Sequence, residues 1–237
     1  MIIDGPGIDL MDGGLGIDTF RRDWTGLNGT EFILDLNFIL GLQGAVGFPP
    51  DGADQFTGIE NYTCTGLIGG IFTGNDVDNA IRTDMGVDTL IGNGGDDYLS
   101  SGGARDRLWG GRGDDTLTGG FDRDVLTGGA GNDQFVFQFP SVGDRITDFS
   151  SNTPGNNDAF YFDGRFFPGP LASGTLDREL FVSRGDNQAQ ELDDRFIFDT
   201  SDQTLWYDGN GSLQGGKVLL ADLQPWATMT FRDIIIF

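Results

Sequence analysis

The sequence predicts an all-β protein: a parallel, two-sheet solenoid, or β-roll, capped by a C-terminal antiparallel β-region. Two observations support this fold class. Seven nine-residue units follow one another without a gap over residues 74–136, and the eighth position of every unit is apolar. Strand-like segments rich in Phe then follow the array. A short fixed period is typical of a solenoid, because one unit alone cannot bury its apolar face.

The region before the array contains a less regular version of the same pattern. Residues 4–21 hold two further units, with Asp9 and Asp18 at the sixth position, but they are out of register with the main array. Over residues 22–73 the period fails while strand patterns persist. We therefore expect residues 1–73 to form turns like those of the array together with a widened solenoid or a small sheet.

The array itself, residues 74–136, is built from units of the form G-G-x-G-x-D-x-U-x, where U is apolar. We expect the first six residues of a unit to form a tight turn and the last three a short strand, with glycines supplying positive φ. Two units then complete one coil, so alternate turns stack on the same edge. The sixth-position residues of the first edge are Asp88, Asp106 and Asp124. Those of the second edge are Asn79, Asp97, Asp115 and Asp133.

Two stacked turns of this kind can enclose an oxygen cage. Each turn contributes one carboxylate and about two backbone carbonyls, and such hard oxygen ligands suit Ca²⁺ better than the smaller, octahedral Mg²⁺. Asp9 and Asp18 are further candidate ligands. The carbonyl ligands are expected at the second and fourth positions of the turns, namely Asn93, Gly95, Gly102, Ala104, Gly111, Gly113, Gly120, Asp122, Gly129 and Gly131.

The stacking also predicts the number of ions. Neighbouring turns give about four strong Ca²⁺ sites and a fifth, weaker one, because Asn79 lacks a charge. Ala104 and Asp122 stand where the repeat has Gly, so we expect strained backbone at both positions. The alternative is a solenoid that uses its Asp residues as turn caps without metal. The joint recurrence of Gly-Gly, Asp and an apolar residue disfavours that alternative.

Residues 137–237 change in character to strands separated by turns. Alternating apolar residues and aromatic enrichment favour antiparallel strands packed on the end of the solenoid. An open solenoid end needs such a cap, since its unpaired edge would otherwise aggregate. The expected strands cover residues 135–139, 144–149, 158–164, 194–200, 203–209, 217–223 and 229–237.

Composition excludes several classes of function. The formal net charge is -23, with 33 Asp and only 4 Glu, and the short Asp side chain suits tight turns that bind cations. This charge disfavours nucleic acid and anionic membranes as partners. The chain has no His, and Cys64 is its one Cys, which excludes Ser-His-Asp catalysis, a common zinc site and an intrachain disulfide. No stretch is long and apolar enough to span a bilayer.

The array resembles the repeats-in-toxin (RTX) family of hemolysin-type calcium-binding repeats. The C-terminal third is similar to the region that follows such arrays in serralysin-like secreted proteins, notably at residues 143–149 and 205–211. The last residues, Asp233 to Phe237, resemble a type I secretion signal. The resemblance implies an extracellular protein that is exported unfolded through an ABC transporter and folds on Ca²⁺ outside the cell. It does not extend to a catalytic domain.

Three functions remain open at this point. The leading one is a non-catalytic, calcium-binding RTX module that is secreted. The second is a Ca²⁺-dependent carbohydrate- or surface-binding module, for which Trp109, Trp206, Tyr207 and Trp226 are candidate stacking platforms, although burial in the fold is the favoured role of these aromatics. The third is a β-helical polysaccharide lyase. Such a lyase would need clustered basic residues, and Lys217 and the 13 Arg are scattered along the sequence.

Overall fold

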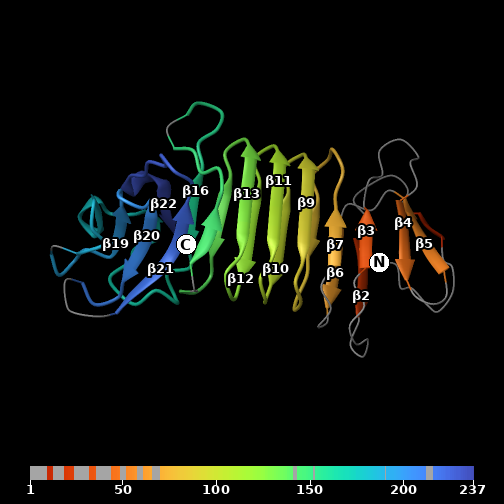
Figure 1. The fold of residues 1–237 in the computed structure, drawn as a ribbon, viewed down its shortest axis with the longest axis horizontal. Coiled ribbons are helices and arrows are strands. Elements are labelled where there is room, and N and C mark those ends of the chain that lie inside the picture. The colour runs from red at the N-terminus through yellow and green to blue at the C-terminus, as the bar shows by residue number, and fades with distance from the viewer. Residues whose placement is uncertain are drawn as a thin grey trace.

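The computed structural model describes residues 71–140, 143–151, 153–189, 191–211 and 216–237 in full, and before residue 71 it describes the backbone of the strands alone. The chain is elongated, with the roll in the middle and the C-terminal cap at the other end from the N-terminal strands (Figure 1). No helix among the described residues is long and apolar enough to cross a membrane.

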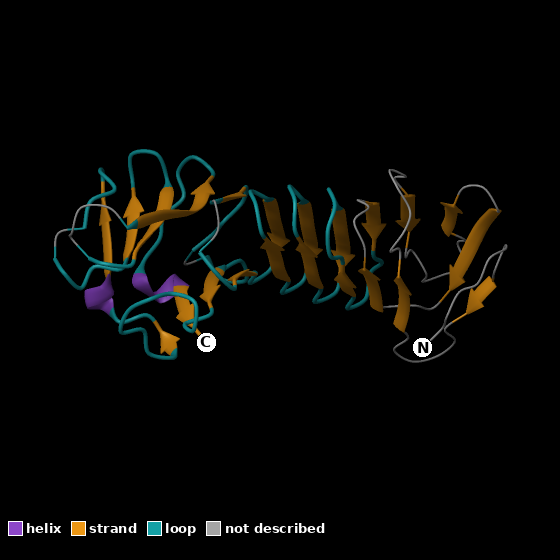
Figure 2. Cartoon of the chain, turned by 90° about the horizontal axis from the view of Figure 1, so that it is seen from below, coloured by secondary structure: helices purple, strands orange, loops and turns teal. Residues whose placement is uncertain are grey.

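Two long sheets, named sheet I and sheet II, face each other across the roll (Figure 2). In spatial order, sheet I consists of β17 (Gly174–Thr175), β22 (Ile234–Ile236), β16 (Ala159–Phe162), β14 (Gln134–Phe137), β12 (Thr116–Gly120), β10 (Tyr98–Gly102), β8 (Ala80–Arg82), β6 (Asn61–Thr65) and β2 (Thr19–Asp23). Sheet II consists of β18 (Phe181–Arg184), β19 (Phe196–Asp199), β20 (Thr204–Asp208), β21 (Lys217–Leu223), β15 (Asp144–Ile146), β13 (Val125–Ala130), β11 (Arg107–Arg112), β9 (Thr89–Gly94), β7 (Gly70–Thr73) and β3 (Phe32–Asp35).

The strand registers confirm a coil of two nine-residue units. In sheet I, Leu99 pairs with Ile81 on one side and Leu117 on the other, in parallel. In sheet II, Leu108 pairs with Leu90 and Leu126 in the same way. The chain therefore alternates between the sheets and advances by one strand spacing per coil, as expected for a parallel β-roll.

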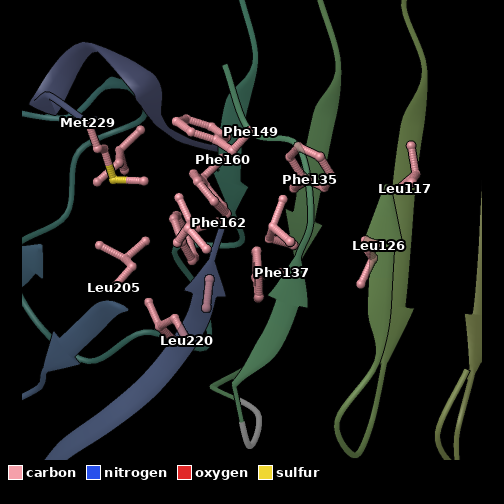
Figure 3. Packing of buried hydrophobic residues seen from close by; sticks show 14 of the residues in the cluster. Leu117, Leu126, Phe135, Phe137, Phe149, Phe160, Phe162, Leu205, Leu220 and Met229 are labelled. Carbon is pink, nitrogen blue, oxygen red and sulfur yellow. The ribbon is translucent and has the colours of Figure 1, made fainter. Parts of the chain in front are cut away.

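The eighth-position residues form the core between the two sheets. They lie in columns and are at most 1% exposed. Toward the cap the aliphatic column gives way to aromatic rings, with Phe149 and Phe160 4.8 Å apart and Phe137 and Phe162 5.1 Å apart between ring centroids (Figure 3). The eighth-position residues of the two sheets are Ile81, Leu90, Leu99, Leu108, Leu117, Leu126 and Phe135.

The C-terminal region differs in part from the expected antiparallel cap. Antiparallel pairing joins β19 to β20, β20 to β21, and β17 to β22. However, β15 pairs with β13 and β21 in parallel, and β16 pairs with β14 and β22 in parallel. The physical reason is that the last coil of a roll presents unpaired N–H and C=O groups, which parallel strands extend in register. The cap thus continues the roll before closing it.

The N-terminal strands extend the roll and add a separate sheet. β6 and β7 pair in parallel with β8 and β9, and β2 and β3 pair with β6 and β7. A three-stranded sheet is formed by β1 (Leu10–Asp12), β5 (Gly52–Thr57) and β4 (Gly44–Phe48). The strands described between residues 10 and 73 therefore include both a continuation of the roll and a separate sheet, while the domain division at residue 73 stays a prediction. The cap also contains two short 3-10 helices, η1 (Arg178–Leu180) and η2 (Phe231–Asp233).

Truncating the core column should strongly destabilise the roll. Leu108 is 0% exposed, so Leu108→Ala is expected to lower the free energy of unfolding in saturating Ca²⁺ by about 3 kcal/mol through lost burial and a residual cavity. The matched control is Leu192→Ala, because Leu192 is 64% exposed and should change stability by less than about 0.5 kcal/mol. Urea unfolding followed by circular dichroism measures both. Equal losses would contradict the assigned core.

Candidate metal-binding edges

Left-handed backbone recurs at the second and fourth positions of the turns. Positive φ occurs at Gly86, Asn93, Gly95, Gly102, Ala104, Gly111, Gly113, Gly120, Asp122, Gly129 and Gly131. The expected strain is present, since φ is 90° at Ala104 and 73° at Asp122. A residue without a side chain suits these positions for a second reason. A Cβ atom at Gly111 would collide with the carbonyl oxygen of Asn93, and one at Gly129 with that of Gly111. The second-position carbonyls therefore point toward the next stacked turn.

The sixth-position aspartates form the two predicted columns. On the second edge the backbone N–H of Asn79 donates to Asp97 Oδ1 at 2.7 Å, that of Asp97 to Asp115 at 2.8 Å, and that of Asp115 to Asp133 at 2.9 Å. On the first edge Asp88 donates to Asp106, and Asp106 to Asp124, both at 2.8 Å. Each carboxylate thus reaches back by 18 residues to the preceding turn.

The second oxygen of these carboxylates is buried among acceptors. Within the described part of the chain, Oδ2 has no hydrogen-bond partner at Asp97, Asp106, Asp115, Asp124 and Asp133. A Cβ atom at Gly92 would collide with Asp97 Oδ2 and would lie 2.5 Å from the Gly110 carbonyl oxygen. Carboxylate and carbonyl oxygens therefore share a space without a donor. Buried unpaired acceptors are costly, and a cation is the group that would satisfy them.

The candidate oxygen ligands come from both the side chains and the backbone of the turns. Among the described residues no three His, Cys, Asp or Glu side chains converge on one point. This is what stacked turns produce, because each turn adds one carboxylate and its own carbonyls. An all-oxygen set of this kind fits Ca²⁺, which accepts backbone carbonyls and irregular geometry, and does not fit zinc or copper, which favour Cys and His.

Burial raises the pKa of the column carboxylates well above the ordinary value. Desolvation is the largest cause in each case, and repulsion from neighbouring aspartates adds to it at all five. The pKa reaches about 8 at Asp97 and Asp124, about 7 at Asp115, and about 6 at Asp106 and Asp133. A carboxylate of these columns therefore binds a proton at a higher pH than an exposed Asp does, and a bound cation would favour its ionised form instead.

Two members of the columns lie beyond the repeat array. Asp144 Oδ1 accepts the N–H of Asp124 at 3.0 Å, and Asp158 Oδ1 accepts that of Asp133 at 3.1 Å. They follow their predecessors by 20 and 25 residues rather than 18, so a search at the fixed period misses them. The available signal was the triplet Asp-x-apolar at residues 144–146 and 158–160. The first column ends where Ala221 pairs with Asp144.

In the first turn of the second edge, the sixth-position side chain makes hydrogen bonds within its own turn. Asn79 Oδ1 accepts the N–H of Asn75 at 2.8 Å, while its Nδ2 donates to Asn75 Oδ1 at 3.1 Å. The left-handed series also starts after this turn, since neither Asn75 nor Val77 has positive φ. The Asn79 amide is satisfied by these hydrogen bonds, and the buried atom left without a partner among the described residues of this turn is a donor, Asn75 Nδ2. Both observations support the expectation of a weak site there. Asp9 and Asp18 lie outside the described residues.

A second column of carboxylates was not anticipated from the sequence. On the second edge the fifth-position residues point the opposite way, toward the following turn. Asp96 donates its N–H to Asp78 Oδ1 and Asp114 donates to Asp96 Oδ1, both at 2.8 Å, and Asn132 donates to Asp114 at 2.7 Å. These side chains are exposed. Water solvates them, so burial of unpaired oxygen distinguishes the sixth-position column.

Comparison with known proteins bears on the array alone. The family model for the RTX calcium-binding nonapeptide repeat (4 copies) matches residues 73–108 and 100–135. No curated protein matches the chain. Residues 73–135 therefore match the family of RTX calcium-binding repeats, which bind Ca²⁺ in general, and the predicted parallel β-roll is confirmed.

Removing the strained side chain at position four should stabilise the roll. Ala104→Gly is expected to raise the free energy of unfolding in Ca²⁺ by about 1 kcal/mol, because an L residue at a φ of 90° is strained and the greater unfolded-state entropy of Gly offsets only part of the relief. Ala130→Gly is the control, since Ala130 lies in β13 without positive φ and should lose about 0.5–1 kcal/mol. Urea titration measures both; losses in both variants would contradict the strain.

The raised pKa values predict an unusual pH dependence of the metal-free protein. The pKa of Asp97 rises from 3.8 to about 8 and that of Asp115 to about 7, so the folded state binds more protons than the unfolded state across this range. Folding stability is then greatest below about pH 4 and is lost as the pH rises toward 8. In metal-free buffer, circular dichroism should show more β structure at pH 5 than at pH 8. Saturating Ca²⁺ should reverse this order, because the ion displaces the protons. The same order in both buffers would contradict it.

Proposed function

We propose that the roll is a calcium-folded module in which about four to five Ca²⁺ ions lie between stacked turns along its two edges. The sixth-position carboxylates and the second- and fourth-position carbonyls are the ligands. The observation that supports this assignment most directly is the buried Oδ2 of Asp97, Asp106, Asp115, Asp124 and Asp133, which has no hydrogen-bond partner among the described residues. Beside Asp97 and Asp115 it shares a space with the carbonyl oxygens of Gly110 and Gly128.

Folding of this module is coupled to the ion. A formal charge of -23 opposes compaction, and the fold concentrates part of it in two buried columns. An unliganded column holds either repelling carboxylates or protons, as the raised pKa of Asp124 indicates. A bound Ca²⁺ supplies positive charge, so the carboxylates can stay ionised without repelling one another. Because the unfolded chain has no preformed cage, binding free energy becomes folding free energy.

We infer that this coupling serves export. In the folded chain Ile234 is 0% exposed and Ile236 is 2% exposed, because β22 is part of the last coil of sheet I. A secretion signal at residues 233–237 is therefore readable only before the roll folds. A calcium-poor cytosol would keep the chain unfolded for an ABC transporter, and extracellular Ca²⁺ would fold it. The protein is then extracellular, and its role in this proposal is non-catalytic.

A pair of adjacent aspartates tests the ligand assignment. Asp115 is 0% exposed and belongs to two proposed cages, whereas Asp114 is exposed beside it. Asp115→Asn should reduce the number of bound Ca²⁺ ions by about one to two and raise the Ca²⁺ midpoint of folding roughly tenfold, since each cage loses a charged ligand. Asp114→Asn changes the net charge equally and should leave both quantities within about twofold. Isothermal titration calorimetry counts the ions, and circular dichroism gives the midpoint.

Two outcomes would contradict the proposal. Equal effects of the two substitutions would show that net charge, rather than ligation, controls folding. A wild-type protein whose circular dichroism spectrum is the same in chelator and in millimolar Ca²⁺ at pH 8 would show that the columns are turn caps without metal.

A further inference from the structure

Arginines that are scattered in the sequence meet at one corner of the roll. Arg107 and Arg145 lie on the outer face of sheet II, in one column with Val125 between them, as the pairing of Arg107 with Val125 and of Val125 with Arg145 shows. Arg105 and Arg123 occupy the fifth position of consecutive first-edge turns, each separated by one Asp from the start of β11 or β13. We call these four residues the arginine corner. All four are exposed.

Three of these side chains have no acidic partner. Arg123 pairs with Asp222 at 2.7 Å, whereas within the described residues Arg105, Arg107 and Arg145 make no side-chain hydrogen bond or ion pair. Unpaired cations are noteworthy in a chain with 14 basic and 37 acidic residues, where partners are abundant. The flanking acids are Asp122, next to Arg123 in the chain, and Asp222. The corner therefore offers guanidinium groups to an external anion.

The outward residues of the sheet beside the arginines include no acid from β9 to β15, and the first acid on the cap side is Asp222 of β21, in register with Arg145. The ninth-position column of sheet II places Trp109 between Ile91 and Thr127, with Thr147 in the next strand. Trp109 is 37% exposed. Carboxylates of the roll lie on the turns, so the outward residues of β9, β11, β13 and β15 include none. An indole next to guanidinium groups on a flat sheet suits a ligand with both apolar ring faces and negative charges.

The spacing of the cations limits the ligand further. Arg107 and Arg145 are two strands apart, which is roughly 9.6 Å at about 4.8 Å per strand. A linear polysaccharide with one uronate per disaccharide repeats its carboxylate on a similar length. A duplex nucleic acid would require many more cations to overcome the net charge of -23, and the same charge repels anionic lipid.

We propose that the arginine corner and Trp109 form a binding face for a linear, uronate-bearing polysaccharide. This inference rests on the proposed calcium-folded roll in one respect. Ca²⁺ in the first-edge cages would neutralise Asp106 and Asp124, which flank Arg105, Arg107 and Arg123 in the chain, so the corner becomes electropositive only when the ions are bound. The second edge keeps its exposed Asp78, Asp96 and Asp114 and stays negative. The electropositive surface is therefore confined to the side of the roll that carries the arginine corner.

Hyaluronan oligosaccharides are a suitable probe, because they alternate a uronate with a neutral amino sugar, and chitin oligosaccharides of equal length are the neutral comparator. Calorimetry on the wild-type chain in millimolar Ca²⁺ should detect hyaluronan binding that weakens with salt, and no binding of the chitin oligosaccharide. The double variant Arg107→Glu, Arg145→Glu should lose at least tenfold in affinity. The matched control is Arg112→Glu, Arg178→Glu, which changes the net charge equally at exposed sites outside the corner and should lose less than threefold.

The results distinguish a failure of the glycan-binding face from a failure of calcium-coupled folding. All variants are first checked by circular dichroism and Ca²⁺ titration, which should match the wild type. A folded, calcium-loaded wild type that ignores hyaluronan, binds both oligosaccharides equally, or loses as much affinity in the control variant as in the corner variant would overturn the glycan face while leaving calcium folding intact. Self-association of the wild type that the corner variant abolishes would assign the corner to a second copy instead. A wild type that does not respond to Ca²⁺ would overturn both proposals.

Discussion

The burial of a carboxylate column along each edge is the constraint on which the rest of the structure depends. One oxygen of a sixth-position Asp such as Asp115 or Asp124 caps the N–H of the preceding turn, and the other is buried without a hydrogen-bond partner among the described residues. The first interaction fixes the stacking of successive coils. The second makes that stacking unfavourable until a cation or proton enters, because a buried unpaired charge costs more than the hydrogen bond returns. The same residue therefore specifies the coil and makes its stability conditional.

The apolar core and the cap follow from this conditional stacking. A core of one side chain per unit, such as Leu108 or Leu117, is thin, and each coil buries its face only against its neighbours. The final array turns need acceptors for their backbone N–H groups, and the cap supplies them through Asp144 and Asp158. The aromatic cluster around Phe160 then thickens the core where the parallel sheets meet the antiparallel strands. The cap thus anchors the roll as well as covering its end.

The sequence predicts the parts of this structure that obey a fixed period. The coil length, the apolar column and the two Asp columns are all consequences of nine-residue spacing, and the strain at Ala104 and Asp122 follows from the missing Gly. The place of Asp144 in the first column is not predictable from the period, because an insertion lengthens its turn. The parallel direction of β21 and β22 is not predictable from the pattern of apolar residues, because their alternation is the same in either direction. The grouping of Arg107 with Arg145 requires the register between strands that are not in one repeat.

Adjacent residues on the second edge show why periodicity alone does not define the site. Asp114 and Asp115 are the same residue type in the same turn, and each carboxylate accepts one backbone N–H from a neighbouring coil. Asp114 points toward the following turn and is exposed, while Asp115 points toward the preceding turn and is fully buried. Only the buried member keeps a buried oxygen without a hydrogen-bond partner among the described residues. In the proposed calcium sites the ligand is therefore the carboxylate on the face of the turn that excludes water, and the nine-residue period alone does not say which of the two adjacent aspartates that is.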